Sequence, residues 1–73
     1  MFDFIRIYCP ELFNARVIHK FQKTTVIDRK MHEHLAVKVW FDGKCETYVF
    51  ASFYDYDDMI EELSQLCEEE IRA

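Results

Sequence analysis

The sequence predicts one α+β domain over residues 1–73: a small antiparallel sheet of three to four strands, with a C-terminal amphipathic helix packed across one face. Asp42 and Gly43 separate two runs in which apolar and polar residues alternate, and such an Asp-Gly pair is a strong signal for a β-hairpin. Farther along the chain, apolar residues recur at helical spacing within an acidic segment. One glycine and one proline in the whole chain indicate short connections between these elements.

The N-terminal residues 2–8 combine aromatic and β-branched side chains, which predicts a strand. Pro10 ends this strand because it cannot donate a backbone hydrogen bond. Residues 9–13 are expected to form a short helical turn, with proline at the first helical position and an acidic residue after it.

The next part of the chain has strong β-propensity in residues 16–21 and 24–27. These segments form either one long strand or two strands. Residues 28–34 show no clear period, and we expect them to be a connection.

Residues 35–41 and 45–53 are the two expected strands of the hairpin. A three-residue loop, residues 42–44, pairs Phe41 with Cys45 and makes one face of both strands almost wholly apolar. A two-residue loop mixes apolar and polar side chains on each face. Because burial of one face fixes the register of a strand pair, we expect the three-residue loop.

In this register, Trp40, Tyr48 and Phe50 share the sheet face that the C-terminal helix leaves uncovered. Exposed aromatic residues mark protein interfaces, so these three are candidate partner-binding residues. The face can be covered by the N-terminal segment, by a second copy of the chain or by a different protein. Because a domain of this size is short of buried area, we expect Trp40 to lie at an interface between chains.

Residues 55–72 are expected to form the helix, with Asp55 or Asp57 as its N-cap. Its polar face is strongly acidic, which indicates either a solvated surface or a surface that imitates a phosphate backbone. Carboxylates near a helix C-terminus oppose the helix dipole by up to about 1 kcal/mol each, which favours a functional role for some of them. The apolar stripe consists of Ile60, Leu63, Cys67 and Ile71, flanked by Met59 and Leu66; the candidate partner-binding carboxylates are Asp58, Glu61, Glu62, Glu68 and Glu69.

The charge of the chain, −5 in total, is divided unevenly. Residues 1–38 carry seven basic and four acidic residues, whereas residues 39–73 carry two basic and ten acidic residues. This asymmetry disfavours direct nucleic-acid binding, since the acidic half repels phosphates, and it favours a basic protein partner.

The sequence contains no motif typical of catalysis or of a cofactor, and we expect neither. His32 and His34 are two residues apart, so on a strand their side chains face the same way and could hold a metal ion. No CxxC pair accompanies them, so we expect no metal site. The three cysteines, Cys9, Cys45 and Cys67, are odd in number and widely spaced, and no secretory signal or membrane span is visible. These features predict a cytoplasmic protein with reduced thiols.

Together, these features predict a non-enzymatic protein-interaction module that binds a protein partner, in particular a basic or nucleic-acid-binding protein. In size, charge and hairpin–helix ending, the chain resembles the small inhibitors that phages make, such as anti-CRISPR and host-takeover proteins. The likeness is one of architecture, and it implies an acidic inhibitor of phage or mobile-element type. The alternative is a homodimeric structural or regulatory domain with no inhibitory target.

Overall fold

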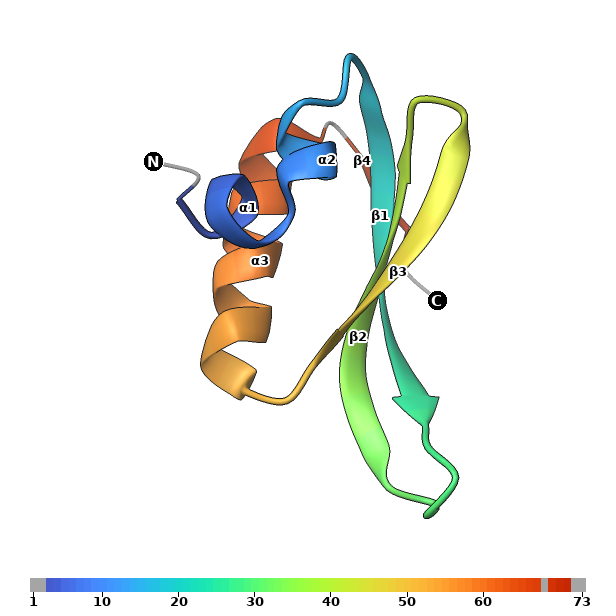
Figure 1. Ribbon diagram of the computed structural model, residues 1–73. Helices are drawn as coiled ribbons and strands as arrows, with labels where there is room; N and C mark the ends of the chain where they lie inside the picture. Colours follow the sequence, from blue (N-terminus) through green and yellow to red (C-terminus); the bar gives the residue numbers. More distant parts are fainter. Residues whose placement is uncertain (1–2, 68, 72–73) are drawn as a thin grey trace.

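A four-stranded sheet carries all the helices on one of its faces in the computed structural model, which describes residues 3–67 and 69–71 (Figure 1). Strands β1 to β3 form an antiparallel meander, and β4 joins the far side of β1 in parallel, so the strand order is β3-β2-β1-β4. The predicted α+β class is confirmed, with a mixed sheet in place of a purely antiparallel one. In chain order the elements are α1 (Asp3–Tyr8), α2 (Pro10–Phe13), β1 (Ile18–Ile27), β2 (Glu33–Phe41), β3 (Lys44–Phe50), α3 (Phe53–Leu66) and β4 (Glu69–Ile71).

The strand expected at the N-terminus is wrong, because α1 is a helix from Asp3 to Tyr8; Phe2 lies outside the described residues. A six-residue helix is too short to persist by its own hydrogen bonds. Burial of Ile5 holds it in place, together with a carboxylate from α3 that accepts hydrogen bonds at its N-terminus. The helical turn expected after it is confirmed as α2, which has Pro10 at its start.

The two β-prone segments that follow form one long strand, β1, with an irregular register between Ile18 and Lys20. The connection to β2 is shorter than expected, because β2 already begins at Glu33. Met31 takes a positive φ of 65° in this turn.

The expected hairpin register is wrong: the loop has two residues, and Phe41 pairs with Lys44. Asp42 and Gly43 both have positive φ, 50° and 79°, as a type I′ turn requires. The Asp42 carboxylate also accepts hydrogen bonds from the backbone N–H groups of Arg16 and Val17, at 3.0 Å for the shortest contact to each. These contacts from distant residues stabilise the short loop.

The corrected register moves the aromatic residues of β3. Tyr48 now lies opposite Val37, and Phe50 opposite Leu35, so both rings are on the face that the helices cover. Trp40 lies on the other face and pairs with Cys45. The three rings therefore do not share one surface.

Helix α3 begins and ends earlier than expected. Ser52 is its N-cap and accepts a hydrogen bond from the N–H of Tyr54 at 3.2 Å, in place of Asp55 or Asp57. The helix stops at Leu66, and the chain then forms β4. Glu69 is therefore in a strand, Glu68 lies outside the described residues, and no unfavourable contact with the end of the helix dipole arises at Glu69.

One core lies between the sheet and the helical layer. Its members come from α1, α2, α3 and the inward face of the sheet, so the N-terminal segment covers the same sheet face as α3 and leaves the other face open. The largest fully buried side chains are Phe21, Phe41, Ile5, Leu12, Met59, Leu63, Val37 and Val39.

Candidate functional site

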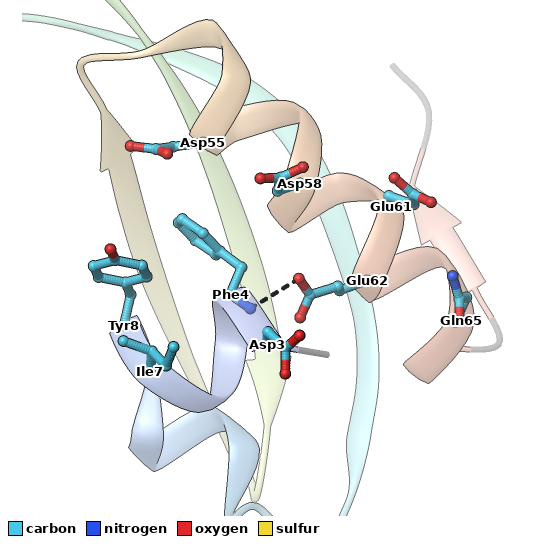
Figure 2. Close-up of a pocket in the computed structure, with 9 residues that line it drawn as sticks. All are labelled: Asp3, Phe4, Ile7, Tyr8, Asp55, Asp58, Glu61, Glu62 and Gln65. Atoms are coloured by element: carbon cyan, nitrogen blue, oxygen red, sulfur yellow. Dashed lines mark hydrogen bonds between the residues drawn. The ribbon is translucent and has the colours of Figure 1, made fainter. Parts of the chain in front are cut away.

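An acidic groove of about 500 Å³ lies between α1 and α3 (Figure 2). Helix α3 contributes Asp55, Asp58 and Glu61, which recur every three residues and therefore lie along one side of the helix. Asp3 of α1 adds a further carboxylate and is 3.3 Å from the Arg6 guanidinium. Among the residues that the structure describes, no basic side chain lines the groove; its lining consists of Asp3, Phe4, Ile7, Tyr8, Asp55, Asp58, Glu61, Glu62 and Gln65.

Glu62 has a structural task in this groove. Its two carboxylate oxygens accept hydrogen bonds from the backbone N–H groups of Phe4, at 3.0 Å, and Ile5, at 3.1 Å. The N–H groups of the first helical turn have no partner within the helix, so a carboxylate from outside can satisfy them and also suits the positive end of the helix dipole. Glu62 thus joins α3 to α1, whereas the sequence analysis expected it to be a partner-binding carboxylate on the polar face of the helix.

Exposed apolar side chains lie beside the acidic ones. Ile7 and Tyr8 are 59% and 68% exposed, and the rings of Phe4 and Tyr8 are in contact, with centroids 4.8 Å apart. Phe53 and Tyr54, at the start of α3, are also exposed. An acidic surface with aromatic residues at its side can bind both the charge and the alkyl stem of a Lys or Arg side chain.

The groove brings together only part of the predicted carboxylate set. Asp58, Glu61 and Glu62 meet there, but Glu69 lies in β4 beside Lys20 on the uncovered sheet face. Asp55 was expected as a helix N-cap and was not among the candidate partner-binding residues. The side chains of α1 were missed, since residues 2–8 looked like a strand. Helical spacing of Phe4, Ile5 and Tyr8 was the available signal for α1.

The predicted aromatic residues are separated. Trp40 is half-buried on the uncovered face, where the Lys20 ammonium lies 5.3 Å from its ring centroid. On the covered side, the Tyr48 hydroxyl donates a hydrogen bond to Glu11 at 3.0 Å, and burial together with this carboxylate raises the pKa of Tyr48. Phe50 packs between Phe4 and Tyr56 in the core.

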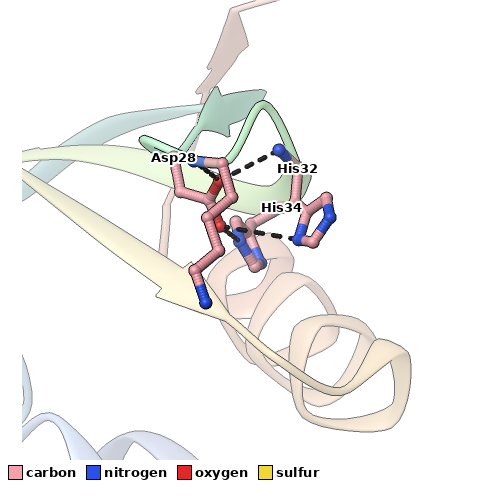
Figure 3. Close-up of polar contacts among 4 residues, drawn as sticks. Asp28, His32 and His34 are labelled. Atoms are coloured by element: carbon pink, nitrogen blue, oxygen red, sulfur yellow. Dashed lines mark hydrogen bonds and ion pairs between the residues drawn. The ribbon is translucent and has the colours of Figure 1, made fainter.

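His32 lies in the turn between β1 and β2, and His34 lies at the start of β2 (Figure 3). The Asp28 carboxylate accepts hydrogen bonds from the backbone N–H groups of Lys30, at 2.8 Å, and His32, at 2.9 Å, and it lies 2.9 Å from Nε2 of His34. The His34 contact and then the backbone donors lower the pKa of Asp28. This arrangement braces the turn. Within residues 3–67 and 69–71, no group of three His, Cys, Asp or Glu residues is placed to hold a metal ion.

Two of the three cysteines are unsuited to nucleophilic chemistry. Cys9 and Cys67 are buried, and burial raises the pKa of each thiol to about 11, with nearby Glu11 and Glu62 adding to the effect at Cys9. Such thiols are protonated at neutral pH, and the thiolate is the reactive form. Cys45 is exposed on the open sheet face beside Trp40.

Comparison of the chain with protein-family models, curated proteins and solved structures finds no match. None of the helices in the described part of the chain is long and apolar enough to cross a membrane.

Proposed function

We propose that this protein is a non-enzymatic interaction module that binds a basic segment of a protein partner in the groove between α1 and α3. The observation that carries the proposal is the convergence of carboxylates and exposed apolar side chains from two helices that are far apart in the sequence. Asp55, Asp58 and Glu61 supply the charge, and Tyr8 and Ile7 supply apolar contact area.

Charge and shape support a basic partner over other ligands. Several like charges along one groove create a negative potential that speeds the approach of a positively charged segment and makes binding sensitive to salt. The same potential repels phosphates, so direct binding of nucleic acid is disfavoured. An Arg side chain has the best fit, since its planar guanidinium can pair with a carboxylate and stack on the Tyr8 ring.

The proposal extends to an inhibitory role. Many basic protein surfaces bind nucleic-acid phosphates, and a partner whose basic segment is held in this groove loses that surface. The protein then acts as a small acidic inhibitor of the phage or mobile-element type. Its three free cysteines are consistent with a reducing, cytoplasmic location.

The test is a titration with a fluorescein-labelled twelve-residue peptide of alternating Arg and Leu, followed by anisotropy at low and high NaCl. The groove variant is Asp58→Asn with Glu61→Gln, which removes two charges from side chains that make no capping contact. The matched control is Asp57→Asn with Glu33→Gln, which changes net charge equally at positions outside the groove lining.

We expect the groove variant to weaken peptide binding at least tenfold at low salt and the control to stay within twofold of the unmodified protein. Equal weakening in both variants would mean that net charge alone attracts the peptide, and no weakening in either would mean that the peptide binds elsewhere. Both results refute the assignment of the groove. A DNA duplex of matched length, titrated in the same way, should not bind.

A further inference from the structure

The two edges of the sheet differ in how they are protected. At one edge, β4 has three residues, and two of them, Glu69 and Glu70, are acidic, so that edge repels another acidic strand and offers little length. At the other edge, β3 runs for seven residues, from Lys44 to Phe50, in uninterrupted register with β2. It contains no proline and no bulge, which are two of the devices that block edge pairing, although it carries the charged residues Lys44 and Glu46.

The hairpin geometry determines which backbone groups of β3 are unpaired. In a two-residue hairpin the flanking residues, here Phe41 and Lys44, exchange both backbone hydrogen bonds. The alternation then turns the N–H and C=O groups of Cys45, Thr47 and Val49 away from β2. No hydrogen bond to these outward groups is found within the described part of the chain. Three donors and three acceptors therefore point outward along the edge.

Space for an added strand exists on the helix side of this edge. A hollow of about 240 Å³ lies where β3 meets α1, and it is lined by Phe4, Tyr8, Cys9, Tyr48, Val49, Phe50, Ala51 and Asp55. On the opposite side the sheet face is open.

We propose that a second copy of the chain occupies this edge: the two β3 strands pair antiparallel about a two-fold axis at Thr47 and form one eight-stranded sheet. This register uses all six outward backbone groups of each strand, because it pairs Cys45 with the partner's Val49 and Thr47 with the partner's Thr47. A two-fold axis at Glu46 places two like charges opposite each other, which is destabilising. An axis at Thr47 instead places Glu46 opposite the partner's Tyr48.

Charge complementarity favours a second copy as the occupant. In the proposed register the partner's Lys44 lies opposite Phe50, and Phe50 and Asp55 line the same hollow. This pairing brings the partner's Lys44 toward the hollow that contains Asp55, where its ammonium group can pair with the Asp55 carboxylate, and the symmetry repeats the contact. Asp55 also lines the acidic groove, so the ion pair shares one carboxylate with the basic-segment proposal. The backbone pairing is separate from that proposal, since neither Thr47 nor Val49 lines the groove.

The first measurement is sedimentation velocity between 1 and 200 µM, which should show a dimer of twice the 8.9 kDa chain mass at the higher concentrations. Thr47→Pro removes an outward N–H group without touching the pairing to β2, and proline is tolerated in edge strands at such positions. It should shift the protein to monomer, whereas the control Thr47→Ala keeps the N–H group and should remain dimeric. A monomer at all concentrations, or a folded Thr47→Pro dimer, refutes the proposal.

Two further measurements test the proposed dimer even if the Thr47→Pro variant fails to fold. Lys44→Asp should weaken the dimer about tenfold, and adding Asp55→Lys should restore it to within threefold, since the charges are then exchanged. Oxidation of the Val49→Cys variant with diamide, which takes up the two thiol hydrogens, should link the introduced thiol to the partner's Cys45 in a covalent dimer, because paired residues lie at a disulfide-compatible spacing.

The unmodified protein should not become cross-linked through Cys45 under the same conditions, because in this register the two copies of Cys45 are four residues out of step. Cross-linking of the unmodified protein, or none in Val49→Cys, would contradict the register. A charge exchange that fails to restore the dimer would contradict the ion pair that selects a second copy.

Discussion

Replacing Glu62 with alanine should destabilise the fold, whereas the same change at Glu61, its neighbour in α3, should not. Glu62 accepts two hydrogen bonds from the first turn of α1, and Glu61 is exposed. The truncation leaves the N–H groups of Phe4 and Ile5 without their acceptor and removes a negative charge from the positive end of the α1 dipole.

The size of the effect follows from the two bonds. A hydrogen bond to a charged group contributes about 1.5–3 kcal/mol, and loss of a helix N-cap costs about 0.5–2 kcal/mol. Because Glu62 is only partly buried, water can replace some of what is lost, so we expect a total near 2 kcal/mol. In a domain of this length, that lowers the melting temperature by roughly 8–16 °C. Glu61→Ala should change the free energy of unfolding by less than about 0.5 kcal/mol.

Urea denaturation followed by far-UV circular dichroism measures both variants. Glu62→Gln is a useful third variant, since its amide keeps one acceptor oxygen and should give an intermediate loss. Hydrogen exchange adds local detail: the amides of Phe4 and Ile5 should exchange faster in Glu62→Ala than in Glu61→Ala. Equal stability of the two alanine variants would show that the α1–α3 connection does not stabilise the fold.

Three more outcomes are expected. Leu63→Ala should cost about 2–5 kcal/mol in urea denaturation, because Leu63 is fully buried under α3 and the change leaves a cavity; a loss below half a kcal/mol would contradict this packing. Hydrogen bonds from the backbone lower the pKa of Asp42, so its stabilising contribution is present above an unfolded-state pKa of about 3.9 and is lost as pH falls through the lower folded-state value. The difference in urea midpoint between the unmodified protein and Asp42→Asn should therefore be present at pH 7 and vanish toward pH 2, and a constant difference would exclude the charge as its source. A disulfide reagent at pH 8 should modify Cys45 rapidly and reach Cys9 and Cys67 only in denaturant, because burial raises the pKa of both thiols to about 11; three fast thiols in the native protein would refute their burial.

Local signals in the sequence were sufficient for the elements whose stability is mainly local. The Asp-Gly turn and the alternation around it predicted β2 and β3, and the apolar stripe with Met59 and Leu63 predicted α3. Pro10 at the start of a helical turn was also correct. In each case the residues that determine the element are close together in the sequence.

The errors arose where distant residues determine local structure. The first segment became helical with the help of Glu62, which is 57 positions from Ile5 and cannot be read from residues 2–8. The two-residue hairpin loop is also stabilised by Asp42 binding the amides of Arg16 and Val17, which lie 25 to 26 positions away in the sequence and were not considered when the register was chosen. Because α1 was not predicted, its side chains in the acidic groove were not predicted either. The wrong hairpin register placed Tyr48 on the wrong face of the sheet.

Because one face of the sheet is open, residues of the central strands β1 and β2 alternate between core positions and positions on the open face. Phe21 and Val37 point into the core, where any change of volume is felt, whereas Gln22, Thr24 and Lys38 alternate with core positions along β1 and β2 and meet no second layer in the described part of the chain. In descendants of this chain, substitutions should therefore accumulate at every second residue of β1 and β2, on the open face. The same alternate positions offer a platform for randomised libraries, since the fold can carry new surface chemistry there while every core contact is kept.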